Sequence, residues 1–140
     1  MSEDAIKYKN YVIPRDRKYA ETHEWIKITE GNKARLGISD YAQKKLKSVV
    51  YVDKPEVGKE FSKGDLITTV ESVKAIGEVF APVRCKVLGF NEELDENPSL
   101  INQDPYEKGW IVEIEVLDLN ELNSLLDAEK YVNEVIKKEE

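Results

Sequence analysis

The chain has 140 residues, of which 41% are hydrophobic and 35% charged, and its formal net charge is −7. This length and composition predict one globular domain with a modest core. The negative charge argues against nucleic acid or an anionic membrane as a partner, because both favour basic surfaces.

The chain contains one cysteine and one histidine, which excludes an intramolecular disulfide and a typical zinc site. We therefore expect no metal. The N-terminus lacks the apolar core of a signal peptide, and no stretch approaches the roughly 20 apolar residues of a membrane span. A cytoplasmic, monomeric protein is expected.

The chain is predicted to divide into a lead-in and a main domain. Residues 1–17 are predicted to form a polar lead-in with one edge strand at 11–13, which Pro14 ends. Residues 18–136 are predicted to form the main domain, including a C-terminal helix.

A hairpin and a short helix are predicted next. Strands at 25–29 and 34–38 are joined through Gly31-Asn32, residues that tolerate the positive φ of a tight turn. Asp40 followed by Gln43 has the spacing of a capping box and predicts the helix N-terminus at Asp40. A further strand is predicted at 48–52.

A second hairpin is predicted from two apolar, β-branched segments, 65–70 and 76–80, that flank a short polar turn. Lys74 lies at the tip of this hairpin. A solvated lysine is protonated at neutral pH and makes a poor nucleophile. The tip therefore favours presentation of Lys74 to a modifying enzyme over catalysis by Lys74. A solvated turn lysine without a function is the ordinary alternative.

The C-terminal half contains two more strands. The first is predicted at 86–90, and residues 91–106 are expected to form a loop with a helical turn at 99–101. The segment 110–116 alternates apolar and polar residues, so one face is expected in the core: Trp110, Val112, Ile114 and Val116.

The chain is predicted to end in a helix capped by Asp127, with Leu126 and Tyr131 as a hydrophobic staple. An apolar stripe on this helix is expected to dock onto the sheet: Ala128, Val132, Val135 and Ile136. Short strands with many turns predict a mainly β fold, as a small barrel or sandwich.

Several collinear motifs together resemble the H protein of the glycine cleavage system, a lipoyl-carrier protein family. They cover about residues 18–135, and include Thr22-His23-Glu24-Trp25, Gly37-Ile38-Ser39-Asp40-Tyr41-Ala42-Gln43, Pro55-Glu56-Val57-Gly58, Glu71-Ser72-Val73-Lys74-Ala75, Asp104-Pro105-Tyr106, Gly109-Trp110 and Leu125-Leu126-Asp127-Ala128. The resemblance implies a barrel-sandwich hybrid, a lipoyl-domain-like fold, with a short internal helix and a C-terminal helix.

The resemblance also implies that Lys74 carries lipoate in an amide bond. The residues around it would supply the shape that a lipoate ligase or a lipoyl or octanoyl transferase recognises: Glu71, Ser72, Val73 and Ala75. Tethering a long arm raises the effective concentration of its reactive end at each partner.

The implied function is a shuttle rather than an enzyme. The arm would collect the aminomethyl group of glycine at a pyridoxal-phosphate-dependent glycine decarboxylase (P protein). It would deliver this group to a tetrahydrofolate-dependent aminomethyltransferase (T protein) and be reoxidised by the flavin-containing dihydrolipoamide dehydrogenase (L protein). The protein supplies placement, and the cofactor supplies the dithiol chemistry.

In the family the loaded arm folds into a surface cleft near the Thr-His-Glu-Trp segment. This implies Glu24 as a partner of the amine, since a carboxylate stabilises an ammonium, although Glu24 could instead be an exposed residue at a strand start. His23, from the same segment, is included among the residues that would bind the intermediate, with a structural polar contact as its favoured role. Trp25 is expected in the core.

One departure from the family stands after Ala81-Pro82-Val83, where Arg84-Cys85 replaces the usual Ser-Gly. Glycine there would permit a positive φ, so with cysteine we expect a negative φ or strain. Cys85 is expected to be a small, semi-buried residue.

Three other functions are weighed against the shuttle. A lipoyl or octanoyl donor to other lipoyl domains would use the same Lys74, and the sequence does not distinguish it from the shuttle. A biotin carrier is disfavoured because biotinyl lysines usually lie between methionines, and the only methionine is Met1. An independent enzyme lacks a Cys-His pair, a phosphate loop, a metal cluster and a nucleophile elbow.

Overall fold

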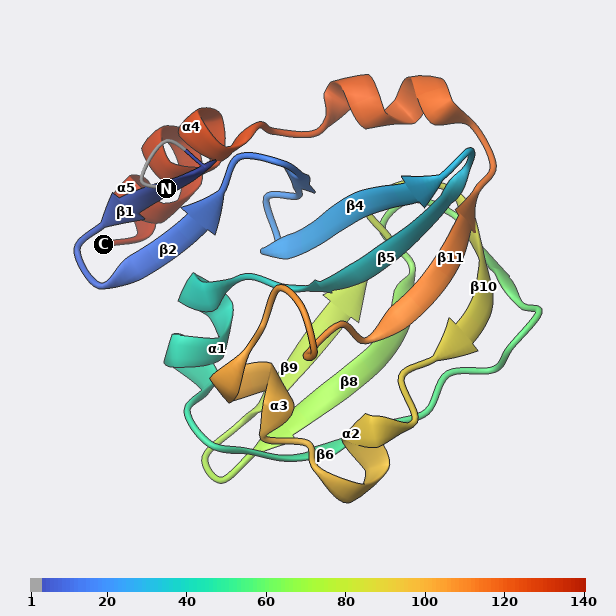
Figure 1. Ribbon diagram of the computed structural model, residues 1–140, viewed down its shortest axis with the longest axis horizontal. Coiled ribbons are helices and arrows are strands. Elements are labelled where there is room, and N and C mark those ends of the chain that lie inside the picture. The colour runs from blue at the N-terminus through green and yellow to red at the C-terminus, as the bar shows by residue number, and fades with distance from the viewer. Residues whose placement is uncertain (1–3) are drawn as a thin grey trace.

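Three antiparallel sheets organise the computed structural model, which describes residues 4–140 (Figure 1). A two-stranded sheet pairs β1 (Ala5–Tyr8) with β2 (Tyr11–Pro14). A three-stranded sheet has the order β6-β8-β9, with β6 at Val49–Val52, β8 at Leu66–Ser72 and β9 at Ile76–Phe80. A six-stranded sheet has the order β3-β4-β5-β11-β10-β7, and its strands are Lys18–Tyr19, Glu24–Glu30, Lys33–Ile38, Val112–Val116, Cys85–Phe90 and Glu60–Phe61.

Short helices surround these sheets. They are α1 (Asp40–Leu46), α2 (Glu93–Glu96), α3 (Leu100–Gln103), a 3₁₀ helix at Leu119–Ser124, and a C-terminal segment made of α4 (Ala128–Tyr131), a π-helical turn (Val132–Ile136) and α5 (Lys137–Glu139). No helix within residues 4–140 is long and apolar enough to cross a membrane.

The main core lies between the six-stranded and the three-stranded sheets. Leu36, Val87 and Ile114 from the larger sheet share one buried cluster with Val70 and Val79 from the smaller one. This packing of two small sheets face to face gives the mainly β, barrel-sandwich architecture that was expected, with a C-terminal helix added outside (Figure 1).

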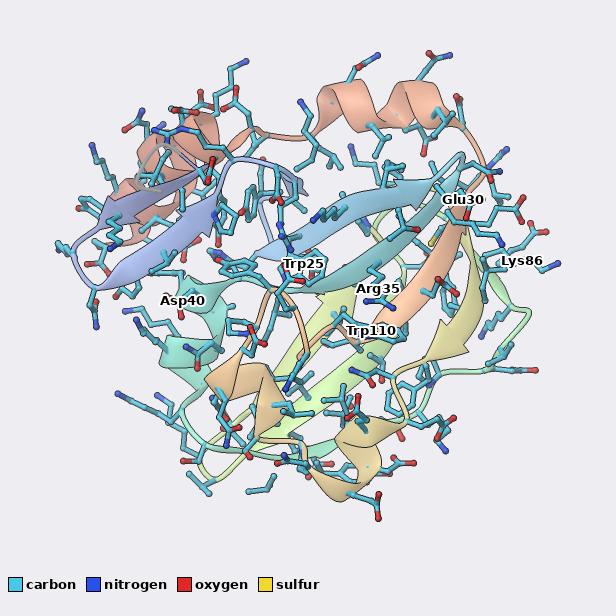
Figure 2. All side chains as sticks on the ribbon, viewed as in Figure 1. Trp25, Glu30, Arg35, Asp40, Lys86 and Trp110 are labelled. Carbon is cyan, nitrogen blue, oxygen red and sulfur yellow. The ribbon has the colours of Figure 1, made fainter. Side chains whose placement is uncertain are left out.

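The alternation predicted for 110–116 is confirmed from Val112 onward, because Val112, Ile114 and Val116 are all buried. It is wrong for Trp110, which precedes β11 and is only partly buried. The Trp110 ring lies outside the sheet, 4.4 Å from the guanidinium carbon of Arg35 (Figure 2). The cation covers one part of the ring, and the rest packs against a second apolar cluster rather than in the main core.

A second apolar cluster joins the two ends of the chain. Ile13 of β2 and Tyr19 of β3 pack with the predicted stripe of the C-terminal helix, whose Ala128, Val132, Val135 and Ile136 are all buried. The rings of Tyr19 and Tyr131 stack at 4.7 Å, and Trp25 belongs to this cluster. The stripe therefore docks mainly on the N-terminal hairpin, whose first strand was not predicted.

The helix caps confirm one prediction and correct another. The Asp127 side chain accepts a hydrogen bond from the Lys130 N–H at 2.8 Å, so Asp127 caps the C-terminal helix as expected. At α1 the cap is Ser39, whose hydroxyl accepts from the Ala42 N–H. Asp40 is instead the first helical residue, and it accepts from the backbone N–H of Val12 at 2.9 Å. Because the Asp40 carboxylate bonds to β2, Ser39 is the residue that caps the helix.

Candidate functional site

Lys74 stands on an exposed turn between β8 and β9, as predicted. Val73 is 70% exposed and Ile76 64% exposed on either side of it, and Lys74 itself is exposed. Figure 1 shows this hairpin tip beside the segment that leaves α1. A side chain in this position is accessible to another protein from several directions.

Ser72 closes the turn through its own side chain. Its hydroxyl oxygen accepts from the N–H of Ala75 at 3.1 Å and from the N–H of Lys74 at 3.3 Å. The backbone N–H of Ser72 donates to the Ala75 carbonyl at 2.8 Å. Local bonds of this kind satisfy turn groups that no strand partner reaches, so they fix the backbone on both sides of Lys74.

The tip is also braced from outside the hairpin. The Val73 N–H donates to the Ser48 carbonyl at 3.0 Å. Val49, which follows Ser48, donates its N–H to the Asn102 side-chain oxygen at 2.9 Å. Asn102 in turn donates to the Lys47 carbonyl at 2.8 Å. The lysine is thus exposed while its backbone is tied to α1 and α3.

The predicted recognition residues surround the tip as one group. Glu71 pairs with Ile76 across the hairpin and with Tyr51 of β6 on its other side. Tyr51 is 51% exposed, so an apolar ring lies next to the Glu71–Ala75 segment. Sequence reasoning missed Tyr51 because only the pairing of β6 with β8 brings it to the tip.

A cleft of about 250 Å³ lies between β9 and α1. It is lined by Thr22, His23, Ile38, Tyr41, Ala42, Lys45, Leu46, Val70, Gly77, Glu78, Val79 and Glu139. Its β9 wall begins at Gly77, three residues after Lys74 in the sequence. A Cβ atom on Gly77 would lie 3.0 Å from Leu46 Cδ1, so the glycine permits close packing of β9 against α1.

Glu24 lies behind this cleft rather than in its lining. Its side chain is fully buried, so the alternative of an exposed strand-start residue is wrong. One carboxylate oxygen accepts from the Phe80 N–H at 2.9 Å, and the other accepts from the hydroxyl of Thr22. Burial raises the pKa of Glu24 to about 7, although the bonds from Phe80 and Thr22 oppose this shift. Thr22, which lines the cleft, connects it to this carboxyl group through its hydrogen bond.

His23 lines the cleft with both ring nitrogens engaged. Nδ1 lies 2.6 Å from the Tyr131 hydroxyl, and Nε2 lies 3.1 Å from both oxygens of Glu139. Burial lowers the pKa of His23, and the nearby Glu139 carboxylate partly offsets this effect. The residue has φ of +83°, a conformation that places its ring between the C-terminal helix and the cleft. These contacts agree with the favoured structural role of His23.

Most of the cleft lining was not singled out from the sequence, including a tyrosine and two carboxylates. Tyr41 comes from α1, Glu78 from β9 and Glu139 from the end of the C-terminal helix. Glu78 lies four residues after Lys74 in a strand, a spacing that could have indicated it. Glu139 gave no local signal, because only the packing of the C-terminal helix brings it to His23.

The departure at Arg84-Cys85 is accommodated without a left-handed residue. Cys85 is the first residue of β10 and is not among the residues with positive φ, as expected. It is fully buried rather than semi-buried, and burial raises the pKa of its thiol to about 12.

Known proteins match most of this chain. The family model for glycine cleavage H-protein matches residues 17–139. A glycine cleavage system H protein of Geobacillus is 44% identical over 124 residues, which is 89% of this chain and 96% of that protein. Mitochondrial glycine cleavage system H protein 2 of Arabidopsis thaliana is 50% identical over 120 residues, which is 86% of this chain and 76% of that protein.

The fold is also matched by a solved structure. The crystal structure of a glycine cleavage system H protein from Mycobacterium marinum superposes with a TM-score of 0.79 at 33% identity. The match covers 87% of this chain and 98% of that one. Together with the exposed, braced lysine and the adjacent cleft, these matches show that the chain belongs to the glycine cleavage H-protein family, the lipoyl-carrying shuttle of the glycine cleavage system.

Proposed function

We propose that Lys74 carries the lipoyl group and that the chain acts as a non-enzymatic shuttle for the aminomethyl group of glycine. The observation that carries the proposal is the tip itself: Lys74 is exposed, while Ser72 and Ser48 fix the backbone around it. A lipoylating enzyme needs a free amine on a rigid backbone, and this turn supplies both.

The surroundings of Lys74 are compatible with a lipoyl group on its amine. An amide on the Lys74 amine would remove its positive charge without breaking any ion pair within residues 4–140. The lipoyl group would supply the dithiol chemistry when bound. The chain would supply a fixed anchor, so the arm begins from one place at every encounter.

The partners that this role implies are the pyridoxal-phosphate-dependent glycine decarboxylase, the tetrahydrofolate-dependent aminomethyltransferase and dihydrolipoamide dehydrogenase. A lipoate ligase or a lipoyl or octanoyl transferase would load Lys74. No catalytic residue is assigned to the chain. The alternative of a lipoyl or octanoyl donor gains no support from the family match, which favours the shuttle.

The cleft beside β9 would shelter the end of the arm. Glu78 and Glu139 line it, and Glu24 lies behind Thr22. A protonated amine brought into the cleft would face these two carboxylates, an arrangement that stabilises a cation. Lys45 also lines the cleft, and its charge is paired with Glu140 at 3.6 Å. We expect Glu78 to contact such an amine directly, and Glu24 to act through the Thr22 hydroxyl.

The test of the carrier role is direct lipoylation. The protein is incubated with a lipoate ligase, lipoate and ATP, and its intact mass and peptide map are measured. We expect a gain of one lipoyl group on the peptide that contains Lys74, and no gain in Lys74→Arg. Lys33→Arg, a matched change of an exposed lysine on β5, should gain the group normally. A folded parent protein that stays unmodified would overturn the proposal.

The cleft is tested with glycine-dependent carbon dioxide exchange and with the lifetime of the loaded protein. Glu78→Gln and Glu24→Gln should both shorten that lifetime, the first more strongly. Glu60→Gln, an exposed change on β7, should leave it unchanged. Equal lifetimes in all four proteins would remove the cleft carboxylates from the function.

A further inference from the structure

A second groove, with a volume of about 730 Å³, opens directly at Lys74, and it shares Lys45 with the cleft between β9 and α1. It lies between the end of α1, α3 and the hairpin tip. Its lining contains four lysines and no carboxylate: Asn10, Tyr11, Gln43, Lys44, Lys45, Lys47, Ser48, Lys74, Ser99, Asn102 and Gln103.

The charge of this groove is opposite to that of the molecule. The chain has 28 acidic residues against 21 lysines and arginines, yet four lysines gather here. Lys44 is paired with Asp40 at 3.2 Å, and Lys45 with Glu140 at 3.6 Å. Within residues 4–140, Lys47 and Lys74 have no acidic partner in ion-pair distance. Two positive charges without an acidic partner therefore line one groove on an acidic protein.

The floor of the groove is rigid. The Asn102 side chain donates to Gln43 Oε1 at 2.9 Å and to the Lys47 carbonyl, while it accepts from Val49. Gln43 donates in turn to buried Asp40 at 2.7 Å. Lys47 ends α1 with φ of +69°, and the following residue braces the tip. The lysines are thus presented from a fixed surface that is continuous with the Lys74 turn.

We propose that this lysine-lined groove is the docking surface for an acidic segment of the enzyme that lipoylates Lys74. The proposal rests on the carrier role of Lys74. Lys74 itself lines the groove, so an enzyme that encloses its amine must cover the neighbouring lysines. Opposite charge on the enzyme face would raise the rate of encounter and orient the tip, whereas the remaining acidic surface of the chain would repel that face.

Acylation of Lys74 would weaken the binding of the enzyme to this groove. Lys74 Nζ forms a bond to the carbonyl carbon of an acyl-adenylate made from lipoate and ATP. The carbon–oxygen bond to the adenylate phosphate breaks, AMP leaves, and the amine loses its protons to become an amide nitrogen. No oxidation occurs. The groove then has three charged lysines in place of four, so its attraction for the acidic segment falls once the product has formed.

The test measures lipoylation rates with the ligase of the organism that encodes the chain, lipoate and ATP. The variant is Lys45→Gln/Lys47→Gln, which leaves Lys44 and its bond to Asp40 in place. The control is Lys18→Gln/Lys33→Gln, which changes the net charge equally through two exposed lysines of β3 and β5. At low ionic strength we expect kcat/KM to fall roughly tenfold in the groove variant and to stay unchanged in the control. The difference in kcat/KM between the groove variant and the control should disappear as salt is raised to about 1 M, where charges are screened beyond about 3 Å.

The outcomes separate this proposal from the carrier role. A parent protein that is not lipoylated at Lys74 overturns the carrier role and the docking surface together. A parent that is lipoylated, with a groove variant equally fast at every salt concentration, overturns the docking surface alone. If pre-lipoylated variant protein instead raises KM only for the decarboxylase or the aminomethyltransferase, the occupant that we name is wrong.

A binding measurement needs no enzyme. A decaglutamate peptide is titrated into ¹⁵N-labelled protein, and amide shifts are followed by NMR. We expect salt-dependent shifts at residues 44–48 and at the tip, and their loss in the groove variant. Shifts spread evenly over the surface, or the same shifts in the groove variant, would contradict an acidic partner at this place.

Discussion

The carboxylate of Glu24 accepts a hydrogen bond from the backbone N–H of Phe80 at 2.9 Å, so the first residue of β4 is joined to the last residue of β9. This bond connects the six-stranded sheet to the sheet that presents Lys74. The carboxylate also accepts from the Thr22 hydroxyl, and its side chain is fully buried. A buried acid that joins two sheets makes their association sensitive to pH.

Glu24→Gln should remove a fall in stability that the parent shows as pH rises. The pKa of Glu24 is about 7 in the folded chain, against an ordinary value of 4.5. Between these values the folded state binds a proton that the unfolded state has released, so the free energy of unfolding decreases with rising pH and then levels off above pH 7. The expected decrease is roughly 3 kcal/mol.

The measurement is the urea midpoint from pH 4.5 to 8 for the parent and for Glu24→Gln, with Glu60→Gln as the control. Glutamine can still accept from Phe80 and donate to Thr22, so the variant should fold. Parallel curves for the parent and Glu24→Gln would show that this carboxyl group titrates normally.

Glu139→Gln should lower the pKa of His23 further. Burial already lowers the pKa of His23 below 6.5, and the Glu139 carboxylate at 3.1 Å opposes that shift. His23 is the only histidine, so its ring resonances are unambiguous in an NMR titration. Glu129→Gln, on α4 and paired with Arg15, should leave the pKa of His23 unchanged. A rise of this pKa in Glu139→Gln would contradict the contact.

Asn102→Ala should destabilise the protein by about 1 to 3 kcal/mol, because the Val49 N–H would lose its acceptor beside a buried side chain. The substitution should also loosen the tip. Asn102 bonds to Lys47 and Val49, the two neighbours of Ser48, and the Ser48 carbonyl accepts from the Val73 N–H. Urea unfolding and hydrogen exchange at Val73 measure these two effects. Asn32→Ala, which removes an exposed bond to Glu115, should change neither, and unaltered Val73 exchange in Asn102→Ala would refute the brace.

Cys85 should be inert to thiol reagents in the folded protein. It is fully buried, and burial raises the pKa of its thiol to about 12, so almost no thiolate forms near neutral pH. Reaction with a chromogenic disulfide reagent should appear only when urea unfolds the chain, with the same midpoint as the loss of secondary structure. Rapid labelling without urea would show that β10 opens locally.

The elements that the sequence predicted are those with strong local signals. The alternation from Val112 to Val116 and the cap at Asp127 depend on neighbours within a few residues, and both are confirmed. The tip around Lys74 belongs to the same class, because two β-branched segments and a polar turn specify a hairpin on their own. Family resemblance then supplied the barrel-sandwich arrangement of these pieces.

The elements that the sequence missed depend on distant partners. The two-residue strands β3 and β7 exist only through pairing with β4 and β10. Ser39 and Asp40 are equally good caps by residue type, and the Val12 N–H decides between them. The burial of Glu24 depends on Phe80, 56 residues later, a relationship that no local pattern contains.

The bond between Glu24 and Phe80 also bears on the solubility of the carrier. β9 is an edge strand. The Ala81 N–H donates to the Asp65 carbonyl, on the side of the hairpin partner, so the N–H of Phe80 points away from β8, where Glu24 accepts it. Unpaired N–H groups on an edge invite a strand of another molecule to pair and begin aggregation. Because Glu24 accepts from this donor within the same chain, the Phe80 N–H is not available to a strand of another molecule, while the hairpin tip at the other end of β9 stays exposed.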